Sequence, residues 1–78
     1  QASWQRNLQR EHVTRLAAAV LRSTGRADAR AIVRLEAETL LRQLQASASG
    51  DRTEQAHRRA CIEMLQGALQ ARVMRTGP

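Results

Sequence analysis

Two glycine-containing breaks divide this chain into three segments of about twenty residues each, and this division constrains the possible folds most. The breaks are 23–27, which reads Ser-Thr-Gly-Arg-Ala, and 47–50, which reads Ser-Ala-Ser-Gly. Each break places a glycine just after a periodic apolar segment, where a helix commonly ends in the left-handed conformation. We therefore predict a single domain over residues 1–78, with helices over about 3–22, 28–46 and 51–74.

Apolar residues recur in all three segments at helical spacings, which indicates one buried stripe on each helix. The stripe of the first segment contains Trp4, Leu8, Val13, Leu16, Val20 and Leu21. The apolar face of the second segment contains Ile32, Leu35, Leu40, Leu41 and Leu44, and is widened by Ala31 and Thr39. The stripe of the third segment contains Ala56, Ala60, Cys61, Met64, Leu65, Ala68 and Leu69, and continues to Val73. The small residues at 56, 60 and 68 predict a close approach of a neighbouring helix.

Polar residues at the expected helix starts support these boundaries. Ser3 is the predicted N-cap of the first helix, and Asp28 is a cap or first-turn acid of the second. Asp51, followed three residues later by Glu54, resembles a capping box at the start of the third. Because the connections are short, sequential helices should pack antiparallel. The predicted fold is an all-α, three-helix antiparallel bundle with up-down-up topology.

The chain contains one Trp and no Phe or Tyr, so its core must consist of aliphatic, Met and Ala side chains. All thirteen basic residues are Arg, and the net charge of +6 would attract polyanions. A small basic nucleic-acid-binding module is therefore one alternative function, although aromatic stacking platforms are missing and charge of this kind usually marks a solvated face. Its candidate residues are Arg6, Arg10, Arg30, Arg34, Arg58 and Arg59.

Side chains with catalytic or metal-binding chemistry are few. His57 and Cys61 are four residues apart and share a helix face, as half of a zinc site would. Further ligands are needed, however, and Cys61 falls on the apolar stripe, where a buried thiol behaves as a small hydrophobe. His12 lacks the His-Glu-x-x-His pattern of zinc peptidases. We therefore predict no catalytic, cofactor-binding or metal-binding residues in this chain.

Three residues are candidates for an interface instead. Trp4 either caps one end of the core or docks on a preceding domain, and both readings stay open. His12 is expected to be a polar interface residue on the first helix, and His57 is the third candidate. Because the core is thin, helix-mediated self-association is another alternative function.

Few features bear on location. One cysteine cannot form an internal disulfide, so the redox compartment stays open. No apolar run reaches the roughly 20 residues that a membrane-spanning helix needs. The chain starts at Gln1 with no Met, so we expect it to be a fragment of a larger protein.

Three patches of the sequence, in order, resemble the C-terminal helical tail of large bacterial zinc-dependent metallopeptidases of the metzincin-like type. The run Arg6–Leu16, which reads RNLQREHVTRL, is similar to the stretch that opens that tail. The sequence 28–31, DARA, is similar to the start of its next helix. The last helix is matched by Thr53, by Ala56 with His57, and by Ala68 with Leu69. The sequence departs from the family pattern at Ala27, where Ser is usual, and at Arg58, where an apolar residue often follows the His.

The resemblance implies a non-catalytic accessory or interaction domain. In that family the zinc ligands and the catalytic Glu lie in a His-Glu-x-x-His-x-x-Gly-x-x-His motif far upstream, so no catalytic residue is carried over to this chain. Zinc would belong to the parent protein, and the partner would be the preceding catalytic domain of the same polypeptide. The resemblance also implies a secreted or periplasmic protein.

Overall fold

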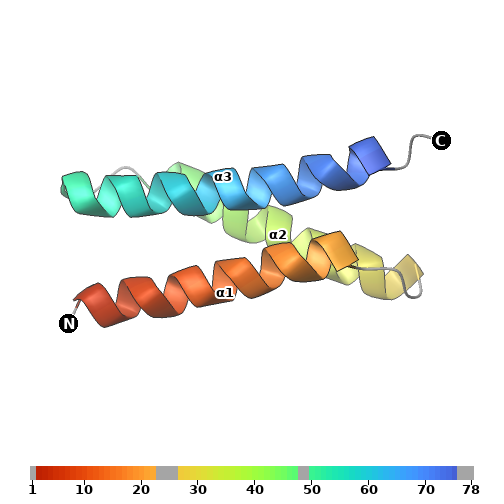
Figure 1. Cartoon of the computed structure of the whole chain (residues 1–78), viewed down its shortest axis with the longest axis horizontal. Helices are drawn as coiled ribbons and strands as arrows, with labels where there is room; N and C mark the ends of the chain where they lie inside the picture. Colours follow the sequence, from red (N-terminus) through yellow and green to blue (C-terminus); the bar gives the residue numbers. More distant parts are fainter. Residues whose placement is uncertain (1, 23–26, 48–49, 76–78) are drawn as a thin grey trace.

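A computed structural model describes residues 2–22, 27–47 and 50–75 of the chain, which form three helices. Helix α1 spans Ala2–Arg22, α2 spans Ala27–Ala46 and α3 spans Arg52–Arg75. As Figure 1 shows, α1 and α3 run in the same direction and α2 runs against them. Every pair of helices is in contact. The predicted all-α, up-down-up bundle is confirmed.

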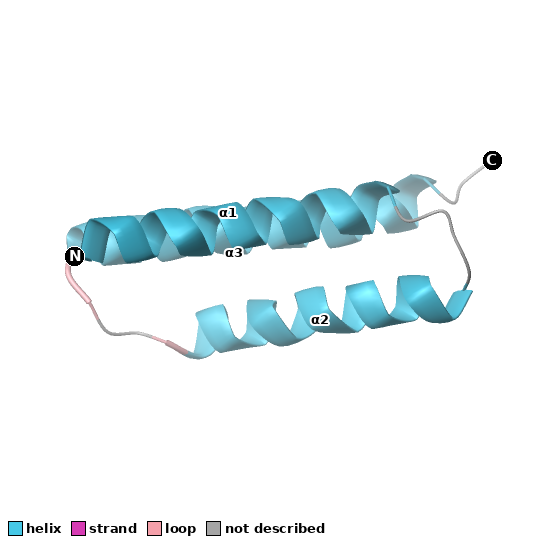
Figure 2. Cartoon of the chain, turned by 90° about the horizontal axis from the view of Figure 1, so that it is seen from below, coloured by secondary structure: helices cyan, strands magenta, loops and turns pink. Residues whose placement is uncertain are grey.

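The most extensive contact joins α1 and α3, which are not neighbours in the sequence. Figure 2 shows these two helices as one layer, with α2 lying along one side of them as a second. The bundle is elongated, with principal extents of 42 × 20 × 16 Å. The pair formed by α1 and α3 is therefore the base on which α2 packs.

The core is built from aliphatic side chains, alanines and one cysteine, as the composition predicts. Its largest fully buried side chains are Leu65, Val13, Val20 and Cys61. Among the residues whose burial is described, the buried set is Val13, Leu16, Ala17, Val20, Ala37, Leu44, Cys61, Leu65, Ala68 and Leu69. Most of this set lies on α1 and α3, because these helices face each other along most of their length.

The predicted stripes are wrong at several positions. In α1 the exposed side chains include Trp4, Leu8 and Leu21, so the reading of Trp4 as a core cap is wrong. In α2 Ile32 and Leu35 are 66% and 60% exposed. Only Ala68 of the three small residues in the third stripe is buried, since Ala56 and Ala60 are exposed.

The misassigned face of α2 has a simple packing cause. Only one side of α2 meets the other two helices (Figure 2), and that side carries Ala37 and Leu44 at its centre. Val33, Leu40 and Leu41 are partly buried beside them. Ile32 and Leu35 lie on a different side of the same helix, about a third of a turn or more away at 100° per residue. The sequence of α2 contains two apolar rows, and the bundle uses one.

The start of α3 is fixed by Asp51. Its Oδ1 accepts a hydrogen bond of 2.9 Å from the backbone N–H of Glu54, which confirms the predicted N-cap. Gly50, just before the cap, has a φ of +106°. This glycine therefore shapes the entry into α3, four residues after α2 ends, and does not terminate α2 as predicted. The glycine of the first break, Gly25, lies outside the described residues.

Of the other two predicted helix starts, Asp28 is confirmed as a first-turn acid and Ser3 as an N-cap is wrong. Ser3 lies within the first turn of α1, since the helix begins at Ala2. Asp28 is a first-turn acid of α2, and its Oδ1 accepts a bond of 2.9 Å from the N–H of Ala29. A carboxylate in the first turn is stabilised by the positive end of the helix dipole.

Removal of the Asp51 cap should destabilise the bundle. For Asp51→Ala we expect a loss of about 1 kcal/mol in the free energy of unfolding, because a first-turn N–H loses its acceptor. In a domain of this size that corresponds to a thermal midpoint lower by about 4–8 °C, measured by far-UV circular dichroism. Asp51→Asn keeps the side-chain oxygen and should stay close to the parent chain. An Asn variant as unstable as the Ala variant would contradict the assignment of the cap.

Candidate functional site

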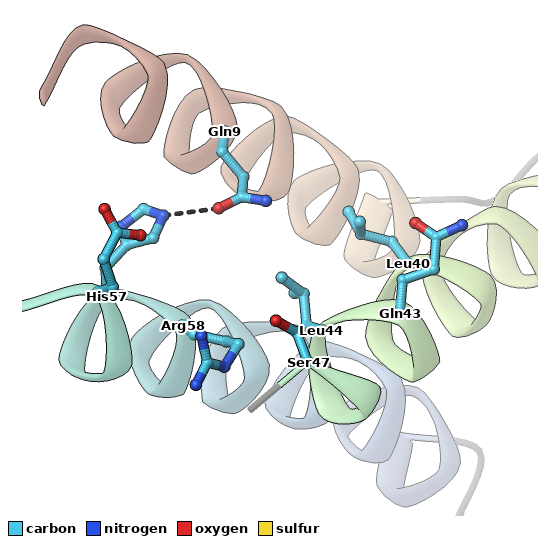
Figure 3. A pocket seen from close by; sticks show the side chains of 8 residues that line it. Gln9, Leu40, Gln43, Leu44, Ser47, His57 and Arg58 are labelled. Carbon is cyan, nitrogen blue, oxygen red and sulfur yellow. Dashed lines mark hydrogen bonds between the residues drawn. The ribbon is translucent and has the colours of Figure 1, made fainter. Parts of the chain in front are cut away.

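A polar pocket opens where the start of α1, the end of α2 and the start of α3 meet (Figure 3). Its volume is about 240 Å³. Side chains from all three helices line it, and most of them are polar: Gln9, Leu40, Gln43, Leu44, Ser47, Glu54, His57 and Arg58. Small-molecule sites are usually larger and mostly apolar, so what distinguishes this polar pocket is the set of hydrogen-bonding groups that it brings together.

His57 is one of three titratable residues that line the polar pocket, with Glu54 and Arg58. Its Nε2 lies 2.8 Å from Gln9 Oε1, which is drawn as the dashed line in Figure 3. Because a carbonyl oxygen can only accept, this geometry requires the ring to carry its proton on Nε2. Burial lowers the pKa of His57 below its ordinary value of 6.5, Glu54 acts in the opposite direction, and Arg6 and Arg10 lower it further. The imidazole is therefore neutral at physiological pH.

Cys61 lies one turn further along α3, with its Sγ 3.7 Å from His57 Nε2. The side chain is fully buried, which confirms that Cys61 belongs to the apolar stripe. Burial raises the pKa of the Cys61 thiol, and Arg10 only partly offsets that rise. A nucleophilic cysteine needs a lowered pKa and access to its substrate. The environment of Cys61 has the opposite properties, so the thiol serves as packing.

The same pair was the only candidate for a zinc half-site. Within the part of the chain that the structure describes, no group of three or more His, Cys, Asp or Glu side chains is arranged to hold a metal ion. Tetrahedral zinc sites in proteins take at least three protein ligands. His57 and Cys61 therefore have no third protein ligand among the described residues.

A salt bridge crosses the neighbouring surface and joins α1 to α3. Arg6 Nη1 donates to Glu54 Oε2 at 2.9 Å, with both side chains partly exposed. Glu54 is thus linked twice: its backbone N–H is capped by Asp51, and its carboxylate is held by Arg6. A partly exposed pair of this kind contributes up to about 1 kcal/mol. It aligns the first turns of two helices that begin 50 positions apart.

The lowered pKa of His57 makes the stability depend on pH. As the pH falls through 6.5, His57 takes up a proton in the unfolded chain before it does so in the folded chain. The contribution of His57 to the free energy of unfolding is therefore complete above pH 6.5 and is lost as the pH falls below it. We expect the thermal midpoint of the parent chain to fall between about pH 7.5 and pH 5.5. In His57→Gln this fall should be smaller, because the amide does not titrate. Equal slopes in the two proteins would contradict the assignment of the effect to His57.

The structure places the three predicted interface residues at different locations. Trp4 is 57% exposed on α1, and Leu8, one turn further along, is 53% exposed; we name these two residues the α1 patch. His12 is exposed in a groove between α1 and α2, where it is next to Ile32 and Leu35. His57 is half-buried in the polar pocket. The structure does not bring the three together into one site.

Two pocket residues, Gln9 and Gln43, had no signal in the sequence. Gln9 lies on α1, 48 residues from His57, and glutamine is an ordinary residue of helix surfaces. Gln43 lies on α2, and nothing local to either residue indicates that the packing of the helices brings both into one pocket. Only the packing of the first helix on the third reveals this hydrogen bond.

The arginines considered for nucleic-acid binding are partly engaged with acids. Besides the pair of Arg6 with Glu54, Arg34 Nε lies 3.2 Å from Glu38 Oε2 on α2. Nucleic-acid binding stays a prediction.

None of the described helices is long and apolar enough to cross a lipid bilayer.

The comparisons with known proteins leave the family open. Searches with the whole chain find no matching family model, no matching curated protein and no matching solved structure.

Proposed function

We propose that this chain is a non-catalytic helical accessory domain that docks on another protein surface through the α1 patch. The observation that carries the proposal is the exposure of Trp4, at 57%, in a chain with no other aromatic residue. Tryptophan is the residue type most enriched at the energetic centres of protein interfaces. Because the indole of Trp4 is mostly exposed to water, it contributes little to the stability of the core.

The geometry of the α1 patch supports docking. Trp4 and Leu8 are four residues apart and therefore neighbours on one side of α1. Both are more than half exposed, while Val13, Leu16 and Val20 further along the same helix are buried. At 100° per residue, Trp4 and Leu8 lie about 130° around α1 from these buried residues, so the α1 patch faces away from the core, where a partner could cover it.

The environment of the polar pocket supports an accessory role. His57 is neutral and bound to Gln9, and Cys61 is a buried thiol with a raised pKa. Cys61 is not prepared for nucleophilic chemistry, and the pair has no third metal ligand among the described residues. These two side chains instead join α1 to α3 and stabilise the helix that carries the α1 patch.

The resemblance to zinc-dependent metallopeptidases suggests the partner. On that basis the chain would be the C-terminal domain of an exported peptidase, and the surface covered by the α1 patch would be the preceding catalytic domain. The zinc and its ligands would then belong to that domain. The chain described here would brace the catalytic domain or contact its substrate.

The first test of this proposal is the coding sequence upstream of the chain. A His-Glu-x-x-His-x-x-Gly-x-x-His motif in the same reading frame is the expected result. If the upstream sequence encodes no metal-binding helix motif, the peptidase assignment is overturned.

The second test addresses docking itself. The longer protein that contains the preceding domain should show Trp4 fluorescence shifted to shorter wavelength relative to the isolated chain, because docking removes the indole from water. The double variant Trp4→Leu, Leu8→Ser should lower the thermal midpoint of the longer protein and leave that of the isolated chain nearly unchanged. As a control, Gln5→Ser alters a neighbouring exposed position and should change neither. An emission spectrum identical in both proteins would refute docking through α1.

A further inference from the structure

A row of exposed side chains follows α2 at alternating spacings of four and three residues. The row, which we name the α2 seam, consists of Asp28, Ile32, Leu35, Thr39, Arg42 and Ala46, all of them exposed. This alternation keeps the six side chains on one side of the helix, and it is the spacing with which one helix packs along another. The face of α2 that binds α1 and α3 is a different one, centred on Ala37 and Leu44.

The α2 seam borders a groove. Ile32, Leu35 and Thr39 form part of its wall on α2, and His12 faces them from α1. The groove is open, with a volume of about 500 Å³, and its lining is mostly apolar. Arg42 lies over the seam, since its Nη2 donates to Thr39 Oγ1 at 3.5 Å. Apolar side chains are thus flanked by charged ones along a single line.

The order of charges along the seam specifies the occupant. Asp28 and Arg42 each lie seven residues from Leu35, on opposite sides of it, which is about 10 Å along the helix axis. Two antiparallel copies of α2 centred on Leu35 would place the Asp28 of each copy beside the Arg42 of the other. A parallel arrangement would instead place like charges together. We propose that the α2 seam pairs with the same seam of a second copy of this chain, in antiparallel orientation.

The remaining groups of the seam are compatible with this pairing. The Leu35 side chains of the two copies meet at the two-fold axis, and each Ile32 lies one turn away on the same apolar line. Asp28 Oδ1 already accepts a bond from Ala29 N, and a carboxylate can accept further bonds. His12 would contact the incoming helix from the far wall of the groove. No buried side chain has to move, because the core face of α2 stays on α1 and α3.

The size of the contact predicts a weak dimer. A helix of 20 residues is about 30 Å long, so one helix pair covers less surface than a stable interface usually does. We expect micromolar or weaker dissociation constants. Sedimentation velocity from about 1 μM to 1 mM should therefore show the mass rising from 8.7 kDa towards twice that value.

Charge reversal tests the orientation. Asp28→Arg places two arginines at each end of the interface, and Arg42→Asp places two acids there. Each variant alone should weaken dimerisation about tenfold, since two attractive contacts become repulsive. An equimolar mixture of the two variants should dimerise about as well as the parent chain, because every end then joins an acid to an arginine. Recovery in the mixture cannot be explained by damage to either fold.

The control is Arg59→Asp, which makes the same change of charge at an exposed position of α3 and should dimerise like the parent chain. Circular dichroism should show equal helix content in all variants. A chain that stays monomeric at every concentration overturns the proposal and leaves the groove to a different partner. Dimerisation that is unchanged in both charge-reversal variants also overturns the proposal. Because the α2 seam and the α1 patch lie on different helices, either result leaves the proposed function standing.

Discussion

Leu65→Ala is expected to lower the free energy of unfolding by about 2 to 5 kcal/mol, the range found when a buried leucine is cut back to alanine. Leu65 is the largest of the fully buried side chains, and the core around it contains no aromatic residue that could move into the space. A domain of 78 residues has roughly 4 to 12 kcal/mol of total stability. The substitution therefore removes a large fraction of it.

Urea titration followed by far-UV circular dichroism measures this loss, at concentrations low enough to keep the chain monomeric. Leu8→Ala is the matched control, because it removes the same atoms from a side chain that is 53% exposed. We expect it to change the stability by less than about 0.5 kcal/mol. Equal losses in the two variants would mean that Leu65 is not in the core.

Gly50→Ala should be destabilising for two reasons that act together. The φ of +106° is a conformation that residues with a side chain rarely adopt, at a cost of about 1 to 3 kcal/mol. In addition, a Cβ at this position would lie 2.7 Å from Glu54 Cβ. Glu54 cannot move away easily, because Asp51 holds its backbone and Arg6 holds its carboxylate. We expect a loss of at least about 1 to 3 kcal/mol, measured by the same titration.

Gly67→Ala provides a control of opposite sign. Gly67 lies inside α3, and a Cβ there would meet nothing within 4 Å. Alanine is the better helix former, so this variant should gain about 0.5 to 1 kcal/mol. If both glycine variants shift the stability in the same direction, the conformational explanation of Gly50 is wrong.

The helices themselves could be predicted from the sequence to within about one residue. Their boundaries follow from local chemistry: a cap at Asp51, a first-turn acid at Asp28, and helix-forming residues between the breaks. Such signals act over a few residues and need no knowledge of the rest of the chain. Topology followed from the short connections for a similar reason, since they leave little freedom to sequential helices.

The face that each helix buries could not be predicted equally well. Ile32 and Leu35 are as apolar as Leu40 and Leu41, and each pair fits a helical row. The choice between rows depends on how α2 rotates against two other helices, which is a property of the assembled bundle. Trp4 and Leu8 were misassigned because the step of five residues from Leu8 to Val13 turns the helix by about 140°, which places the pair on a different side of α1 from the buried stripe.

The polar pocket was harder to predict from the sequence than the buried faces of the helices. His57 and Cys61 are one turn apart, so their proximity was predictable. The partner of His57 was not, because Gln9 comes from the other end of the chain and reaches the pocket only through the packing of α1 on α3.

The full burial of Cys61 at the contact of α1 with α3 gives the bundle a built-in reporter of its own opening. A thiol reagent can attack this sulfur only in molecules in which the two helices have separated. The rate of modification is therefore proportional to the fraction of such molecules when opening and closing are fast. Every substitution that loosens the bundle should accelerate labelling in proportion to the population of open molecules. The rate of labelling of the one cysteine would thus report, under native conditions and without denaturant, the fraction of molecules in which α1 and α3 have separated.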